Sequence, residues 1–331
     1  MTIDKNKLYN PEIKMDYLNT FDNEQSKITI AYILYKAKDS EEIYKKDLYE
    51  FDIEEIKNVL HNTNPLNRMI AKTNGLMISN YISWAIEKGL KKSNLNPLTD
   101  KSVEWYEQFV DKSKKIFITR DELKEIEKDL VNAQDAVIPY LIFEGVLGTG
   151  ASELINLKQS DIEENNVLYL EDDKYGKREI TVSEDCMRLI RQAIKETEYH
   201  KANGKSQSKN QILKLVNNEY VIRSAQTNTE AITKRADKHL VYRRIATISE
   251  FFELPYLNAK NIQKSGMIYM AKELYLRDGK LGKEQLYEVA ERFGVRKQKI
   301  NGYEFYNTTL LKEFINAENI KSLYGIEIKN I

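Results

Sequence analysis

Hydrophobic and polar positions in the first hundred residues recur with the spacing of α-helices. Asn or Asp precedes several of the apolar runs, which is typical of helix N-termini. The pattern therefore predicts a compact bundle of four or five helices. The expected segments are an arm or short helix at 1–20, a helix over 23–38, a segment opening at 39–42, a helix starting at Asp52, a long helix from Asn64-Pro65 to Gly89, and a shorter one around 103–109.

The rest of the chain is also mainly helical, with one predicted β-hairpin. Residues 119–122 carry the signature of a capping box, and an almost wholly apolar run predicts a buried helix at 134–147. Two β-type runs, 167–170 and 179–182, flank a charged turn. From Asp185 nearly to the end, helical patterns resume. The expected fold class is mainly α with a small β-sheet.

A short charged stretch, Lys112-Ser113-Lys114-Lys115, is the best candidate for a linker. A length of 331 residues exceeds one ordinary domain and suits two. We expect a helical domain over 1–111, a linker over 112–117 and a second domain over 118–331.

The composition is that of a folded, highly charged protein, with 41% hydrophobic and 31% charged residues. No apolar run approaches the roughly 18 residues that cross a bilayer, and the polar start does not resemble a signal peptide. The single cysteine, Cys186, excludes an internal disulfide framework and fits the reducing cytoplasm, where we expect the protein to act. We interpret it as a half-buried helix residue rather than a nucleophile.

The charge is unevenly distributed although the formal net charge is zero. Residues 1–60 hold 9 Lys/Arg and 13 Asp/Glu, whereas residues 201–303 hold 20 and 10. A chain of this kind can present a basic face to phosphates while staying neutral as a whole. Ordinary solvated helix faces are the alternative explanation.

One segment near the middle of the chain carries a specific motif. Residues 147–154 read L-G-T-G-A-S-E-L, and Asn156-Leu157 and Ser160-Asp161 follow. This resembles the T-G-x-R-x-S-E-L-x-x-L-x-x-x-D helix turn of the tyrosine recombinase (phage integrase) family, and the resemblance covers roughly residues 24–320. It implies an N-terminal helical core-binding (SAM-like) bundle and a C-terminal catalytic-type domain that together clamp duplex DNA. In that motif an Arg grips the scissile phosphate, and Gly150 stands in its place.

The other family motifs also match incompletely. In the family, a second Arg, a Lys and two proton-transfer residues assist a Tyr that attacks phosphorus. By the resemblance, Gln263 takes the place of the second Arg, and Lys260 and Val295 take the places of the proton-transfer residues. Lys174 in the hairpin turn resembles the family's Lys. A nucleophile candidate exists at Tyr303 or Tyr306, although core packing is the alternative in a chain with 21 tyrosines.

These replacements remove the groups that would stabilise a pentacoordinate phosphorus, so we expect no catalysis. DNA binding is expected to persist, because it rests on many Lys and Arg contacts to phosphates. The candidate DNA-binding residues, each with a solvated surface role as the alternative, are Arg68, Lys72, Thr73 and Asn74 in the first domain and Lys174, Lys177, Arg178, Lys234, Arg235, Lys238, Arg243, Arg244, Lys260, Lys264, Arg296, Lys297 and Lys299 in the second.

The resemblance implies a sequence-specific DNA-binding transcriptional regulator, and more narrowly a prophage repressor of lysogeny on an inactive recombinase fold. Double-stranded operator DNA is the expected partner, and a protein or peptide-linked regulator is a further candidate partner. Two alternatives stay open. One is an active site-specific recombinase with displaced catalytic residues, and the other is a partner-binding protein without a role on DNA.

A C-terminal helix at 309–323 is expected to pack on a neighbouring copy and to give a homodimer. We expect no cofactor and no metal, because no His/Cys/Asp cluster has metal spacing and no phosphate loop or dinucleotide fingerprint occurs. The three histidines, His61, His200 and His239, fall outside every family motif and are interpreted as surface or packing residues.

Overall fold

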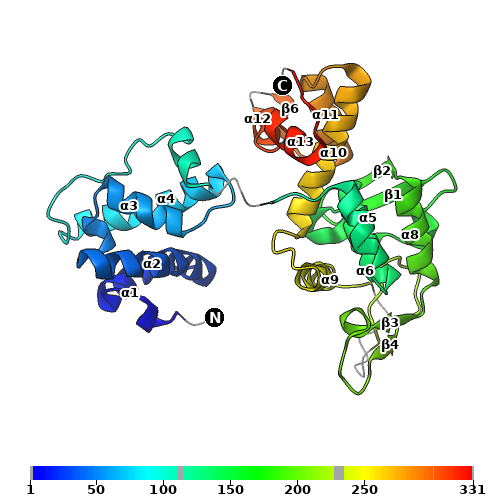
Figure 1. The fold of residues 1–331 in the computed structure, drawn as a ribbon, viewed down its shortest axis with the longest axis horizontal. Coiled ribbons are helices and arrows are strands. Elements are labelled where there is room, and N and C mark those ends of the chain that lie inside the picture. The colour runs from blue at the N-terminus through cyan, green and yellow to red at the C-terminus, as the bar shows by residue number, and fades with distance from the viewer. Residues whose placement is uncertain (1–2, 111–114, 227–234, 301, 330–331) are drawn as a thin grey trace. The chain divides into compact units, whose positions relative to one another are not determined.

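The chain folds into two compact units, Met1–Lys115 and Ile116–Ile331, and each has its own hydrophobic core (Figure 1). Part of the linker predicted at 112–117 and the candidate residue Lys234 lie outside the described residues. The computed structural model describes residues 3–110, 115–226, 235–300 and 302–329.

The first unit is helical, as predicted. Helix α3 starts where the sequence indicates, because Asp52 and Glu55 form a reciprocal capping box with hydrogen bonds of 2.9 and 2.8 Å. The elements are the 3₁₀ helices η1 (Lys5–Lys7), η2 (Leu48–Glu50) and η3 (Glu104–Phe109) and the α-helices α1 (Pro11–Leu18), α2 (Glu24–Tyr44), α3 (Ile53–Asn62) and α4 (Arg68–Glu87).

Two predicted helix boundaries in the first unit are wrong. Residues 39–42 continue α2 instead of opening a new segment, and the buried Glu41 carboxylate there accepts a hydrogen bond from Lys14 Nζ at 2.5 Å. Helix α4 begins after Asn67 rather than at Asn64, because the Asn67 side chain accepts a hydrogen bond from the backbone N–H three residues later. Asn64 has a φ of +46°, outside the extended range of an N-cap residue.

A buried polar cluster joins three elements of the first unit. The Lys14 ammonium of α1 lies 2.5 Å from the Glu41 carboxylate of α2 and 3.2 Å from Asp47. The Tyr81 hydroxyl of α4 donates to the other Asp47 oxygen at 2.8 Å. Buried charges are tolerated when they are paired and hydrogen-bonded, so this cluster fixes how α1, α2 and α4 pack.

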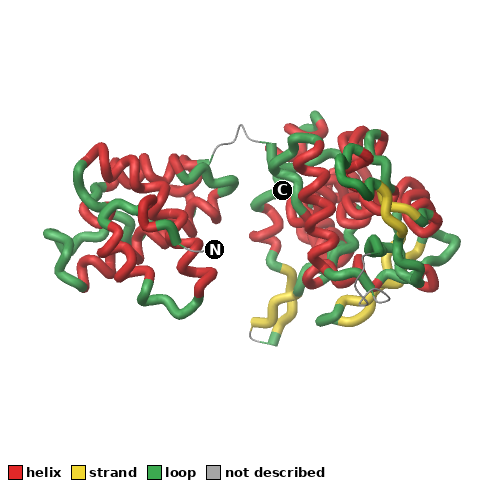
Figure 2. The backbone as a smooth tube through the Cα atoms, turned by 90° about the horizontal axis from the view of Figure 1, so that it is seen from below, coloured by secondary structure: helices red, strands yellow, loops and turns green. Residues whose placement is uncertain are grey.

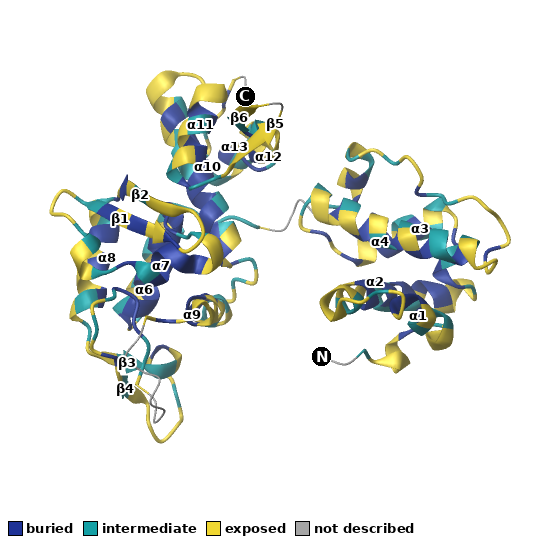
Figure 3. Ribbon diagram, turned by 180° about the vertical axis from the view of Figure 1, so that it is seen from behind, coloured by how far each residue is buried: buried dark blue, intermediate teal, exposed yellow. Residues whose placement is uncertain are grey.

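The second unit is built around α6, in which every residue from Gln134 to Phe143 is buried (Figure 3). This confirms the predicted buried helix, which ends at Phe143 rather than at residue 147. Helices α8, α9 and α10 pack around α6. The α-helices of the unit are α5 (Arg120–Lys128), α6 (Ala133–Phe143), α7 (Ser152–Asn156), α8 (Glu184–Lys195), α9 (Lys238–Phe251), α10 (Ala259–Asp278), α11 (Lys283–Arg292), α12 (Thr308–Lys312) and α13 (Ala317–Tyr324), and the 3₁₀ helices are η4 (Thr149–Ala151), η5 (Gln159–Asp161) and η6 (Lys201–Gly204).

The described strands form three separate antiparallel pairs (Figure 2). The predicted hairpin is confirmed, with Val167 opposite Thr181 and Asp172 opposite Gly176. The expectation of continuous helix after Asp185 is wrong, because two further strand pairs interrupt it. A polar, Ser/Asn/Lys-rich stretch separates one pair, and Gly302 lies in the turn of the other. The strands are β1 (Val167–Asp172), β2 (Gly176–Thr181), β3 (Glu198–His200), β4 (Ile212–Lys214), β5 (Lys297–Ile300) and β6 (Tyr303–Tyr306).

The tail differs from the single helix predicted at 309–323. It forms α12 and α13, and Asn316 caps the second by accepting a hydrogen bond from the Asn319 N–H at 2.9 Å. Ile315 and Ile320 are fully buried in a core shared with α10 and α11 of the same chain. The family resemblance implied packing of this tail on a neighbouring copy, whereas Ile315 and Ile320 are covered within the chain itself.

The structure bears on the expectations for the cysteine, for membrane-spanning helices and for a metal site. Cys186 is fully buried in α8 rather than half-buried, and burial raises the pKa of its thiol. Among the described helices, none combines the length and the hydrophobicity that a bilayer crossing requires. Within the same residues, no group of three or more His, Cys, Asp or Glu side chains is arranged to hold a metal ion.

Candidate nucleic-acid interface

A cleft of about 420 Å³ in the second unit brings together the segments that resemble the recombinase motifs. It is lined by residues from the loop before α7, the β1–β2 hairpin, the start of α10 and the segment from α11 to β6. Lys260, Gln263, Val295 and Tyr306 all lie in its wall. Positions far apart in the sequence therefore meet at one site.

The loop before α7 is fixed to the hairpin by the buried Asp172 carboxylate. It accepts hydrogen bonds from the backbone N–H groups of Thr149 at 2.5 Å, Lys174 at 2.8 Å and Tyr175 at 3.0 Å. Burial raises the pKa of Asp172, but these donors outweigh it and hold the pKa below the usual value. Gly148 lies close by with a φ of +69°, and a Cβ there would lie 2.8 Å from Asp172 Oδ2.

Gly150 lies beside the cleft rather than in its wall, although its neighbour Thr149 lines it. The φ of Gly150 is +64°, and Ala151 has the same φ, so the backbone here departs from a regular helix turn. Among the described residues, a Cβ at Gly150 would meet only the Lys238 side chain, at 3.6 Å. Space is available at this position, but the backbone conformation is one that residues other than glycine adopt at a cost.

Arg178 lines the cleft, and most of its donors are engaged by protein groups. Its guanidinium makes a two-pronged ion pair with Glu153, with hydrogen bonds of 2.5 and 2.7 Å. It also donates to the carbonyl oxygens of Arg292 at 2.5 Å and Gly145 at 2.6 Å. Because four of its five donors serve the fold, Arg178 connects the hairpin to α7, α11 and the end of α6.

Lys260 and Gln263 lie one turn apart on α10 and contact each other, with Lys260 Nζ donating to Gln263 Oε1 at 3.1 Å. Partial removal from water lowers the pKa of Lys260. Lys264 lies next to them with its ammonium 4.9 Å from the centre of the Phe314 ring, and partial burial and then the charge of Lys260 lower its pKa. Lys260 therefore places positive charge in the cleft wall, and Lys264 adds a second cation next to it on α10.

The wall formed by the segment after α11 carries Val295, Arg296 and Tyr306. The Arg296 guanidinium lies 3.1 Å from the centre of the Tyr175 ring, which joins this segment to the hairpin turn. The Tyr306 side chain is 9% exposed and packs edge-on against Tyr287, with ring centres 5.0 Å apart. Tyr306 thus combines the predicted packing role with a place in the cleft.

Two protein-family models match the chain. The model described as "MrpR, C-terminal catalytic domain" matches residues 117–325, and "MrpR, N-terminal core-binding domain" matches residues 8–87. A relative in Bacillus subtilis (strain 168), the "SPbeta prophage-derived uncharacterized protein YopR", is 32% identical over 326 residues, which is 97% of this chain and 98% of the relative. The chain belongs to the MrpR family.

Solved recombinase structures are more distant from this MrpR-family chain. XerA recombinase is 13% identical with a TM-score of 0.41, over 95% of this chain and 96% of that one. A lambda integrase(75-356) dimer bound to a COC' core site is 14% identical with a TM-score of 0.43, and the match covers 89% of this chain and 97% of that one. The Tn1549 transposon integrase in complex with a circular intermediate DNA is 10% identical with a TM-score of 0.48, and the match covers 94% of this chain and 96% of that one. The predicted fold class, mainly helical with core-binding and catalytic-type domains, is confirmed by the two family models.

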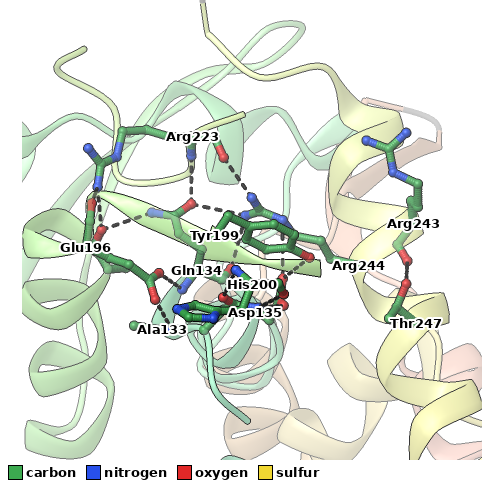
Figure 4. A network of polar contacts seen from close by, with 12 residues as sticks. Ala133, Gln134, Asp135, Glu196, Tyr199, His200, Arg223, Arg243, Arg244 and Thr247 are labelled. Carbon is green, nitrogen blue, oxygen red and sulfur yellow. Dashed lines mark hydrogen bonds and ion pairs between the residues drawn. The ribbon is translucent and has the colours of Figure 1, made fainter. Parts of the chain in front are cut away.

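Two predicted DNA contacts of the MrpR-family chain lie in its interior. Asn74 is 9% exposed and donates a hydrogen bond to Thr63 Oγ1 at 3.0 Å. Arg244 is 3% exposed and forms an ion pair with Asp135 at 3.3 Å (Figure 4). Neither side chain can reach a phosphate while these contacts persist, so both expectations are corrected.

The interior of the second unit holds a polar network that the sequence reading missed (Figure 4). The Arg223 guanidinium donates to the carbonyl oxygens of Ala193 at 2.8 Å and Glu196 at 2.5 Å, at the C-terminus of α8. Arg244 donates to the Arg223 carbonyl at 2.7 Å and to Gln134 Oε1 at 3.1 Å. The hydrophobic pattern of α9 does carry a signal for the burial of Arg244, because this residue falls on the same helical face as the buried apolar residues.

The remaining candidates are at the surface or partly exposed. Arg235 forms an ion pair with Asp173 in the hairpin at 2.9 Å, and Arg243 extends away from the buried network in Figure 4. Lys174, Lys177 and Lys238 are exposed, whereas Arg68 and Lys72 are half-buried on α4. The exposed lysines and arginines of the second unit, including those at the cleft, are accessible to a polyanion.

Proposed function

We propose that this MrpR-family chain is a sequence-specific DNA-binding transcriptional regulator, a repressor of prophage genes in the bacterial cytoplasm, that does not exchange DNA strands. The observation that carries the proposal is the composition of the cleft. Its described lining contains a lysine, a glutamine and a valine at motif positions 260, 263 and 295 and no histidine, and its Arg178 is engaged by Glu153. The relative YopR is itself prophage-derived.

We infer the loss of strand cleavage from the residues that stand at the motif positions. By the resemblance, strand cleavage would need charge at position 150 and proton transfer at positions 260 and 295. Gly150 offers no charge, Val295 offers no proton, and a lysine is a weak proton donor at neutral pH. Each lost electrostatic donor costs roughly 10²–10³ in rate, by analogy with oxyanion donors. We therefore propose that the second unit is inactive in strand cleavage, although the matching family model is described as a catalytic domain.

DNA binding requires less than cleavage does. Affinity for a duplex comes mainly from cations placed against phosphates, and it needs neither proton transfer nor a nucleophile. Lys177, Lys260 and Arg296 line the cleft, and Lys174 lies next to it. These cations can hold one stretch of phosphate backbone while a helix or strand reads bases beside it.

The test uses the full chain in two assays. Crosslinking and recovery of DNA from a lysogenic cell should yield a small set of related sequences, and anisotropy with one such duplex should show salt-dependent binding. A nicked suicide substrate of the same sequence should give no covalent protein–DNA adduct. Tyr306→Phe should bind and repress a reporter as wild type does. Absence of duplex binding at low salt would refute the proposal.

One observation favours a second candidate, an active recombinase. Tyr306 lines the cleft with Lys260 and Arg296, so a nucleophile and cations are present at one site. A covalent adduct that forms with wild type and disappears in Tyr306→Phe would establish this alternative and overturn our proposal.

A further inference from the structure

The β5–β6 hairpin forms a sheet of its own in the described structure. Lys297–Ile300 pairs only with Tyr303–Tyr306, and the hairpin projects from the helices of the second unit (Figure 2). All four β5 residues are exposed. A lone two-stranded ribbon is marginally stable in water, and Tyr306 is its one residue in the hydrophobic core of the described chain. Such an element is better suited to contacting a partner.

The register gives the hairpin two different faces. Directly opposite residues share a face, so Lys297 and Lys299 lie on the side of Tyr306, whose side chain lines the cleft. The other face carries Ile300 opposite Tyr303 at the far end of the hairpin, and these side chains are 53% and 78% exposed. One side is therefore basic and next to the cleft, and the tip is apolar and open to solvent.

The charge on this segment is not neutralised by the protein. Within the described residues, Arg296, Lys297 and Lys299 form no ion pair with a carboxylate, and Glu304 lies opposite Lys299 without pairing to it. Val295 and Arg296 precede β5 directly and line the cleft. Positive charge thus continues from the cleft along the hairpin, which matches a polyanion better than an uncharged partner.

We propose that the β5–β6 hairpin enters the major groove of duplex DNA, with Lys297 and Lys299 against phosphates and Ile300 and Tyr303 against base edges. This rests on the DNA-binding function proposed above. Two strands lie about 4.8 Å apart, so a ribbon with its side chains fits the major groove of about 12 Å and not the minor groove of about 6 Å. Apolar tips match thymine methyl groups, which are exposed only in the major groove.

Substitutions on the two faces separate the two roles. The probe is a duplex that the full chain selects from a random-sequence library, and anisotropy at several salt concentrations gives Kd and its salt slope. Lys299→Ala should lower the slope by about 1, because one phosphate contact is lost. Tyr303→Ala should raise Kd at least about fivefold with an unchanged slope. Lys195→Ala, at an exposed position of α8, is the control and should match wild type.

The base contact has its own test. Replacing thymine by uracil removes the methyl groups from the selected duplex. This should weaken binding by wild type, with little further effect on Tyr303→Ala. Equal sensitivity of wild type and Tyr303→Ala to uracil would refute the major-groove contact.

The outcomes also distinguish this inference from the function on which it rests. If wild type binds the selected duplex specifically while Lys299→Ala and Tyr303→Ala match it in Kd and slope, the hairpin role is refuted and the regulator stands. If the full chain binds no duplex at low salt, both are refuted. Unchanged melting temperatures of the variants, expected for exposed positions, assign any loss of binding to the contact itself.

Discussion

Gly150 differs from the recombinase motif in its backbone as well as in its missing guanidinium. Its φ of +64° and the same φ at Ala151 place two consecutive residues in the left-handed region. That conformation costs a residue with a Cβ about 1–2 kcal/mol. An arginine introduced at position 150 would therefore have to rebuild the turn before it could reach a phosphate, and Val295 would still lack a proton to transfer.

Substitutions at the two glycines of this turn should differ in cost. Gly150→Ala is expected to lower the unfolding free energy by about 1 kcal/mol, because the space is open and only the backbone is strained. Gly148→Ala should cost more, since its Cβ would also lie 2.6 Å from Ser152 Oγ. Urea unfolding followed by circular dichroism gives both values. Equal losses would contradict the steric argument.

Alanine substitutions of two neighbouring cations in the hairpin should have separate effects, one on stability and the other on DNA binding. Arg178→Ala leaves the buried Glu153 carboxylate without its partner and should lower the unfolding free energy by about 2 kcal/mol or more. Lys177→Ala should leave stability unchanged and weaken DNA binding, because this side chain is exposed at the cleft. Urea titration and anisotropy measure the two effects. A stable Arg178→Ala with impaired binding would restore the direct DNA role that the sequence predicted.

At the scale of elements, the charged cluster between α1, α2 and α4 predicts a pH dependence of the first unit. Burial raises the pKa of Glu41 to about 7, against the effect of the Lys14 ammonium. The native state then binds a proton more tightly than the unfolded chain, whose value is near 4.5. The stability from this group is complete below about pH 4.5 and is lost as the pH rises through about 7.

Glu41→Gln removes this titration and should flatten the dependence. Both tryptophans, Trp84 and Trp105, lie in the first unit, so their fluorescence during urea unfolding reports on it selectively. The stability of wild type relative to Glu41→Gln should fall between pH 5 and pH 7.5. A difference that stays constant over this range would contradict the raised pKa.

The tail offers a second prediction at this scale. Ile315→Ala should lower the unfolding free energy by about 2–5 kcal/mol at every protein concentration, because Ile315 is buried within its own chain. Leu310→Ala on the neighbouring α12, at a side chain 48% exposed, is the matched control and should have little effect. Calorimetry at two concentrations measures both. A concentration-dependent loss in Ile315→Ala would indicate packing between copies instead.

At the scale of the whole molecule, DNA binding is expected to draw on both units. Lys72 lies on α4 of the first unit and Lys177 lies in the hairpin of the second. Replacing each by alanine should lower the salt slope by about 1, and the double variant by about 2, because the contacts are independent. Anisotropy of the four proteins on one selected duplex tests this. A slope that responds only to Lys177 would exclude the first unit from the contact.

The sequence alone determined the features that depend on local pattern. The helix start at Asp52, the capping box at Thr119, the buried helix α6 and the β1–β2 hairpin follow from residue order and periodicity. The motif around Gly150 indicated the fold class because the residues that form this turn and pack it are neighbours in the sequence. These are short-range effects, so neighbours along the chain are enough to predict them.

Only the tertiary structure decided which charges serve the fold and which face solvent. Arg178 and Arg244 read as surface cations, yet their partners Glu153 and Asp135 lie 25 and 109 residues away along the chain. The same holds for the tail, in which Ile315 and Ile320 are covered by α10 and α11, and for the projecting β5–β6 hairpin. Periodicity places Arg244 on the buried face of α9, but the partners of Arg178 and Arg244 depend on long-range contacts, which periodicity does not encode.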